Sequence, residues 1–89
     1  MYFVYIIKSL KDGNYYVGIT SNLGKRLNEH NRGKNRSTKG RVPFKLVNYE
    51  EFDTLSGARQ REKFLKSYKG VREKRKLMGE GNNNYSRVV

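Results

Sequence analysis

The sequence is short of several residue types, and each shortage excludes a class of protein. There is no cysteine, which rules out disulfide bonds and thiolate metal sites and fits a reducing compartment. No apolar run approaches the roughly 20 residues that a membrane-spanning helix needs. The chain opens directly with a predicted strand, so we expect no signal peptide. These features favour a cytoplasmic protein without membrane contact.

Acidic residues are also scarce. Asp and Glu total 8 against 20 Lys and Arg, which gives a net charge of +12 over 89 residues. Such an excess in so short a chain favours a polyanionic partner, most often nucleic acid, over a merely solvated basic surface. No basic amphipathic helix with bulky apolar residues is evident, which disfavours an anionic membrane as the partner.

Two short segments rich in β-branched and aromatic residues predict the first two strands, at residues 2–7 and 15–20. The segment between them contains Asp12 and Gly13. This pair favours a hairpin because glycine tolerates a positive φ. The first two strands are therefore predicted to pair antiparallel.

The register of this hairpin decides where two phenols lie. A loop at residues 12–13 would pair Tyr5 with Thr20, whereas a loop at residues 10–11 would pair Tyr5 with Tyr16. Both registers place Tyr5 and Tyr16 on the same face of the sheet, because side chains alternate with period two. We predict that shared face.

A serine–asparagine pair then predicts the start of a helix over residues 23–31. Helical spacing places Leu23 and Leu27 together on one stripe. Arg26 and His30 fall on the adjoining flank of the same stripe. The side of this helix that faces the core is therefore predicted to be half apolar and half cationic and titratable.

Residues 32–42 form a predicted mobile loop with five cations, two glycines and almost nothing to bury. It is either a solvated linker or, as we favour, a phosphate-contacting segment, because such contacts need charge and reach. With one basic residue from each of the predicted helices at 23–31 and 55–67, the predicted nucleic-acid-binding set is Lys25, Arg32, Lys34, Arg36, Lys39, Arg41 and Lys66.

A third strand is predicted over residues 44–52, directly after the single proline. Alternation divides it into two faces, with Phe44, Leu46 and Asn48 on one and Lys45, Val47 and Tyr49 on the other. The acidic pair Glu50-Glu51 is interpreted as a solvated strand end rather than a metal site.

The pair Asp53-Thr54 can cap the next helix, which is predicted over residues 55–67. In this helix Leu55, Ala58 and Leu65 form an apolar stripe. Glu62 falls in the middle of that stripe. A carboxylate on an apolar face is costly unless it is paired or binds a metal. Basic residues one turn before and one turn after it offer an ion pair, so both roles remain open.

The remaining chain predicts a short basic helix over residues 71–78 and a disordered tail over 79–89. The domain therefore spans residues 1–78. The predicted fold class is α/β of the α+β type, a small three-stranded antiparallel sheet flanked by three helices in the order ββαβαα.

The polar groups predicted to face the core share one chemistry. Phosphodiester hydrolysis needs an activated water, a cation against the added negative charge, and help for the leaving oxygen. The set Tyr5, Tyr16, Arg26, His30 and Glu62 supplies a proton acceptor, a bidentate donor to phosphate and a carboxylate ligand. Mg²⁺ tolerates a single protein carboxylate because it keeps most of its waters.

These residues carry a family resemblance. Val4-Tyr5-Ile6 followed by Tyr16-Val17-Gly18 resembles the paired signature of the GIY-YIG nucleases. Residues 16–30 are similar to the family's second strand and first helix, and residues 58–66 to the helix that carries its metal-binding Glu. The resemblance covers residues 2–68, in a short form like the excision-repair incision subunit's nuclease half and the Holliday-junction-type nucleases.

The resemblance implies a one-metal DNA endonuclease that leaves 5′-phosphate and 3′-hydroxyl ends, in DNA repair, recombination or processing. It implies Tyr5 and Tyr16 near the water and phosphate, Arg26 on phosphate and His30 as general base or its helper. Glu62 would bind Mg²⁺, with Mn²⁺ as the alternative. RNA is an alternative ligand, and a protein partner or homodimer is an alternative source of specificity.

Two positions depart from the family pattern. Val4 replaces the first glycine of the signature, which we attribute to strand packing. A family asparagine downstream of the metal-binding Glu has no counterpart at residues 74–77, and the nearest asparagines are at 82–84. A catalytically weak or inactive nucleic-acid-binding accessory protein on the same fold is therefore the alternative function.

Overall fold

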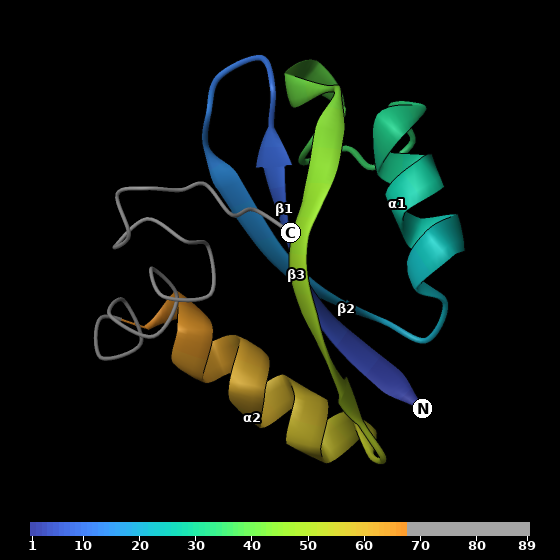
Figure 1. Ribbon diagram of the computed structural model, residues 1–89, viewed down its shortest axis with the longest axis vertical. Helices are drawn as coiled ribbons and strands as arrows, with labels where there is room; N and C mark the ends of the chain where they lie inside the picture. Colours follow the sequence, from blue (N-terminus) through green and yellow to red (C-terminus); the bar gives the residue numbers. More distant parts are fainter. Residues whose placement is uncertain (68–89) are drawn as a thin grey trace.

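The computed structural model describes residues 1–67 (Figure 1). Its elements are β1 (Tyr2–Ser9), β2 (Tyr15–Thr20), α1 (Leu23–Asn31), the 3-10 turn η1 (Lys39–Arg41), β3 (Phe44–Phe52) and α2 (Leu55–Lys66). The predicted helix over residues 71–78 and the predicted tail over 79–89 lie outside the described residues.

The three strands form one antiparallel sheet in the order β2-β1-β3, as the sequence predicted. The two helices cover opposite faces of this sheet (Figure 1). The cluster beneath α2 contains Val4, Ile6, Val17, Val47, Ala58 and Leu65, and the cluster beneath α1 contains Tyr5, Ile7 and Phe44. Because β1 is central, its alternate side chains enter both clusters.

The predicted face of the hairpin is confirmed, whereas both predicted registers are wrong. Tyr5 pairs with Gly18, and Tyr16 pairs with Ile7. The Ser9 hydroxyl accepts the backbone N–H groups of residues 11 and 12, which holds the loop over residues 10–13. The observed partner of Tyr5 lies two residues from each predicted partner. A shift of two residues keeps every side chain on its face of the sheet, so Tyr5 and Tyr16 still share a face.

A β-bulge changes the pattern of β3. Ile6 pairs with Asn48 and Ile7 pairs with Leu46, so Val47 is an extra residue without a partner on β1. Strict alternation therefore describes the strand only up to Val47. Past the bulge, each side chain lies on the face opposite to the one that we predicted.

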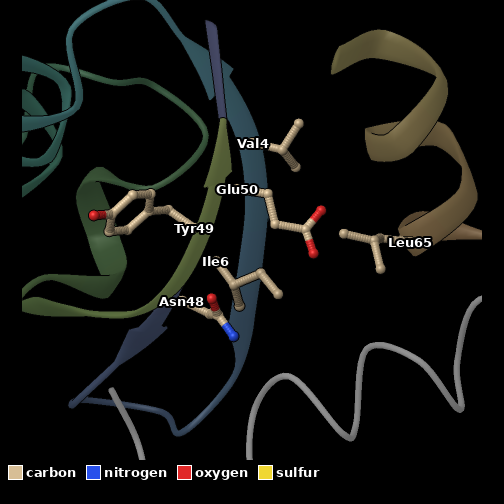
Figure 2. Close-up of a pocket in the computed structure, with 6 residues that line it drawn as sticks. All are labelled: Val4, Ile6, Asn48, Tyr49, Glu50 and Leu65. Atoms are coloured by element: carbon tan, nitrogen blue, oxygen red, sulfur yellow. The ribbon is translucent and has the colours of Figure 1, made fainter. Parts of the chain in front are cut away.

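Three side chains show the consequence. Asn48 and Glu50 lie on the α2 side, whereas Tyr49 points to the opposite side (Figure 2) and packs edge-on against Phe3 at 5.9 Å between ring centroids. The predicted faces of Asn48 and Tyr49 were wrong because the bulge at Val47 reverses the alternation. Glu50 is not a merely solvated strand end, because it accepts two hydrogen bonds from Arg61 at 2.7 and 2.9 Å.

The helix boundaries follow the predicted signals closely. Asn22 caps α1 by accepting the N–H of Lys25 at 3.0 Å, and Thr54 caps α2 by accepting the N–H of Gly57 at 3.0 Å. α1 ends before Gly33, whose φ is +74°. Neither helix in the described part of the chain is long and apolar enough to cross a membrane.

Candidate active site

Tyr5 occupies the centre of the sheet, on the α1 face. It is 1 % exposed, and its hydroxyl is 2.9 Å from His30 Nε2. The phenol crosses directly over its strand partner Gly18, where a Cβ would lie 2.5 Å from the Tyr5 hydroxyl. Only a residue without a side chain leaves this path open, so Gly18 permits the contact between strand and helix.

His30 projects from the last turn of α1 and is fully buried. Its ring packs edge-on against Tyr5 at 5.8 Å and against Tyr16 at 5.1 Å between centroids. Its second ring nitrogen, Nδ1, is 2.7 Å from the hydroxyl of Thr38. Both nitrogens of the imidazole therefore have a hydrogen-bond partner. One partner lies on β1 and the other in residues 32–42, here called the basic loop.

Burial governs the protonation of this pair. Removal from water lowers the pKa of His30 from its usual 6.5, and the positive charge of Arg26 lowers that pKa further. Burial also raises the pKa of Tyr5, although the neighbouring guanidinium of Arg26 opposes the change. At neutral pH the site therefore holds a neutral imidazole and a protonated phenol.

Arg26 lies beside Tyr5 on the predicted flank of α1. Its guanidinium pairs with Glu29 at 3.2 Å. Among buried side-chain nitrogens and oxygens of residues 1–67, its Nε is the one without a hydrogen-bond partner. The exposed part of this guanidinium can bind an incoming oxyanion, since arginine offers five donors in a fixed fork.

Glu62 comes from α2, which covers the opposite face of the sheet. Its side chain is 25 % exposed and accepts a hydrogen bond from Lys66 at 3.0 Å. The Lys66 ammonium in turn lies 6.0 Å from the Tyr16 ring centroid, and the charge of Glu62 contributes to raising the pKa of Tyr5. Because β2 is an edge strand, these α2 side chains lie close to the tyrosines.

The carboxylate of Glu62 fits a divalent cation that keeps its own water ligands. No group of three or more His, Cys, Asp or Glu side chains that could hold a metal occurs within residues 1–67. A single carboxylate suits Mg²⁺, which accepts one or two carboxylates and keeps several of its waters. Of the two predicted roles of Glu62, the ion pair with Lys66 is observed, and metal ligation stays a prediction.

The basic loop has one buried residue that the sequence analysis missed. Thr38 is 0 % exposed, and it is the single buried residue in a loop that was expected to have almost nothing to bury. Arg41 is also held, by Asp12 at 3.1 Å and over the Phe44 ring at 5.6 Å. The other four cations are exposed: Arg32, Lys34, Arg36 and Lys39.

The paired tyrosines, the glycine beneath Tyr5 and the arginine and histidine one helical turn apart agree with a family match. The family model of the GIY-YIG catalytic domain matches residues 1–76. The chain belongs to the GIY-YIG family. Membership implies nuclease-type activity on DNA, and GIY-YIG nucleases generally use divalent metals.

Relatives of similar length support the GIY-YIG assignment. A UPF0213 protein of Haloquadratum walsbyi is 41% identical over 80 residues, covering 89% of this chain and 86% of its own. The UPF0213 protein YazA of Bacillus subtilis is 38% identical over 89 residues, covering 99% and 87%. The solution NMR structure of a UPF0213 protein from Bacillus halodurans has a TM-score of 0.52 and 34% identity, covering 96% and 90%.

The glycine of this YIG-type motif is predicted to be a steric requirement. Gly18→Ala would drive a methyl group into the Tyr5 phenol, so we expect the free energy of unfolding in urea to fall by about 1–3 kcal/mol. Gly24→Ala is the matched control, because its nearest neighbour is Asn22 Oδ1 at 4.0 Å. The control should stabilise α1 by up to about 1 kcal/mol. Equal stability of Gly18→Ala and wild type would contradict the observed path of the phenol.

Proposed function

We propose that this protein is a divalent-metal-dependent DNA endonuclease that leaves 5′-phosphate and 3′-hydroxyl ends, in cytoplasmic DNA repair, recombination or processing. The observation that carries the proposal is the buried hydrogen bond between the Tyr5 hydroxyl and neutral His30, with the Arg26 guanidinium beside it. The net charge of +12 supports a polyanionic substrate.

The proposed reaction assigns one proton path. The Tyr5 oxygen takes a proton from water as its own proton passes to His30 Nε2, and the resulting hydroxide attacks phosphorus. Arg26 donates to a nonbridging oxygen, where negative charge grows in the transition state. The bond to the 3′-oxygen breaks, and that oxygen leaves with a proton from solvent. Tyr16, whose ring packs against the same imidazole at 5.1 Å between centroids, would orient the phosphate.

A bound Mg²⁺ or Mn²⁺ would supply Lewis-acid stabilisation of the phosphate and of the leaving oxygen. Glu62 is the residue proposed to hold it. The Lys66 ammonium now pairs with Glu62, so metal binding would compete with this ion pair. That pair favours the second candidate function, a DNA-binding accessory protein without activity.

Substitution of Glu62 distinguishes the two functions. We expect Glu62→Gln to lower single-turnover cleavage in Mg²⁺ at least about hundredfold, while affinity for DNA stays within about threefold. Cleavage would be measured on supercoiled, branched and single-stranded DNA, with EDTA as the metal-free arm. The products would be tested for 5′-phosphate and 3′-hydroxyl ends.

Lys66→Gln is the matched control for Glu62→Gln. It removes the same ion pair but keeps the carboxylate, so we expect cleavage at saturating DNA to persist. Glu51→Gln, on an exposed carboxylate of β3, controls for the loss of one negative charge. Folded wild-type protein that binds every substrate and cuts none would favour the accessory function.

Phosphate contacts are proposed for the exposed cations of the loop, for the exposed Lys25 of α1 and for Lys66, whose ammonium lies 6.0 Å from the Tyr16 ring centroid. Arg41 is the exception, since Asp12 and the Phe44 ring already engage it. Such contacts make DNA affinity fall with salt because bound counterions are released. RNA is the alternative ligand, and a protein partner or a second copy is the alternative source of specificity.

The salt dependence of DNA binding tests the loop directly. Lys34→Ala combined with Arg36→Ala removes two of the proposed phosphate contacts, so the slope of log affinity against log salt should become shallower by about 1.8 for duplex DNA. Lys45→Ala is the control, because Lys45 is exposed and lies on the face opposite to Phe44. An equal change in the control would contradict a specific role for the loop.

A further inference from the structure

The buried hydroxyl of Thr38 is the most unusual group in the basic loop. Its neighbours in sequence are exposed, yet Thr38 is 0 % exposed and its Oγ1 lies 2.7 Å from His30 Nδ1. A buried hydroxyl is costly unless it is hydrogen-bonded. We propose that Thr38 is a positioning residue that holds His30 with its proton on Nδ1, so that Nε2 is left to accept the proton of Tyr5.

The direction of the hydrogen bonds follows from the chemistry of imidazole. A neutral ring has one N–H donor and one nitrogen acceptor. Either Tyr5 donates to Nε2 and Nδ1–H donates to Thr38, or Thr38 donates to Nδ1 and Nε2–H donates to Tyr5. The two bonds are therefore coupled, and the partner on one side of the ring decides the role of the other.

Arg26 favours the first direction, and Thr38 supplies the acceptor that this direction needs at Nδ1. Its guanidinium can only donate, so its charge favours a Tyr5 oxygen that acts as an acceptor toward it. The Tyr5 proton is then free to point at His30 Nε2. In the second direction the Nε2–H group of His30 would donate to the Tyr5 oxygen, which already faces the Arg26 guanidinium.

Thr38 is itself held independently of α1. Its N–H donates to the Asn35 carbonyl at 3.1 Å, and the turn that follows it is fastened by Ser9, whose hydroxyl donates to the Arg41 carbonyl at 2.6 Å. The threonine is therefore attached to β1 through the loop. A shift of this turn relative to β1 would therefore move the Thr38 hydroxyl away from His30 Nδ1.

The remaining surroundings of His30 leave the tautomer to these contacts. The titratable or charged groups around the ring are Tyr5 on β1, Tyr16 on β2, and Arg26 and Glu29 on α1. From β3, the ring meets apolar Phe44 at 5.8 Å between centroids. Of these residues, Tyr5 is the one hydrogen-bonded to a ring nitrogen, at Nε2. Thr38 is thus the hydrogen-bond partner of the other ring nitrogen, Nδ1.

The tautomer can be measured without DNA or metal. His30 is the single histidine of the chain, so its two ring nitrogens give one unambiguous set of ¹⁵N signals. At neutral pH we expect a protonated, pyrrole-type Nδ1 and a pyridine-type Nε2 in the wild type. Thr38→Val keeps the shape but removes the acceptor, so the proton should move to Nε2. Thr38→Ser keeps the hydroxyl and should retain the wild-type pattern.

A wild-type ring with its proton on Nε2 would overturn the proposal, and this result needs no variant to fold. An unchanged tautomer in folded Thr38→Val would overturn it as well. A dispersed amide spectrum, recorded on the same samples, establishes that each variant is folded.

The consequence for catalysis rests on the proposed nuclease function. If His30 Nε2 takes the Tyr5 proton, Thr38→Val should lower the single-turnover rate at saturating DNA at least about tenfold and leave DNA affinity unchanged. Thr38→Ser should stay within about twofold of wild type. Absence of cleavage by the wild type would defeat the nuclease function, whereas the NMR result would still decide the tautomer.

Discussion

The hydrogen bond between the Tyr5 hydroxyl and His30 Nε2 is the contact on which the rest of the site depends. It joins the central strand to the end of α1 inside the core. It exists only because Gly18 leaves a path for the phenol across the neighbouring strand. A small domain buries little surface, so using part of its core for two polar rings is a substantial constraint on the sequence.

The two faces of the sheet have different tasks. The face beneath α1 carries the tyrosines, arginine and histidine, whereas the face beneath α2 is an apolar cluster. Glu62 belongs to the helix on the apolar side, but β2 is an edge strand, and the Lys66 ammonium that pairs with Glu62 lies 6.0 Å from the Tyr16 ring centroid. The proposed metal ligand can therefore approach the proton path without interrupting the core that holds it.

Local signals predicted most of this arrangement. Caps at Asn22 and Thr54 and the spacing of apolar residues gave the helices, and helical periodicity brought Arg26 and His30 to one flank. Period-two alternation put Tyr5 and Tyr16 on one face. The hairpin register and the bulge at Val47 were beyond these signals, because both depend on which residues pair across strands. Thr38 was missed because a lone threonine among cations carries no pattern of its own.

Single-turnover cleavage by Tyr5→Phe in Mg²⁺, measured alongside DNA affinity, tests whether the buried phenol transfers the proton. This change removes one hydroxyl and keeps the ring that packs on His30. If the phenol transfers the proton, cleavage should fall about 10²–10⁴-fold while affinity for DNA is unchanged. Cleavage by Tyr5→Phe at the wild-type rate would show that the buried contact is only structural and that the water is activated elsewhere.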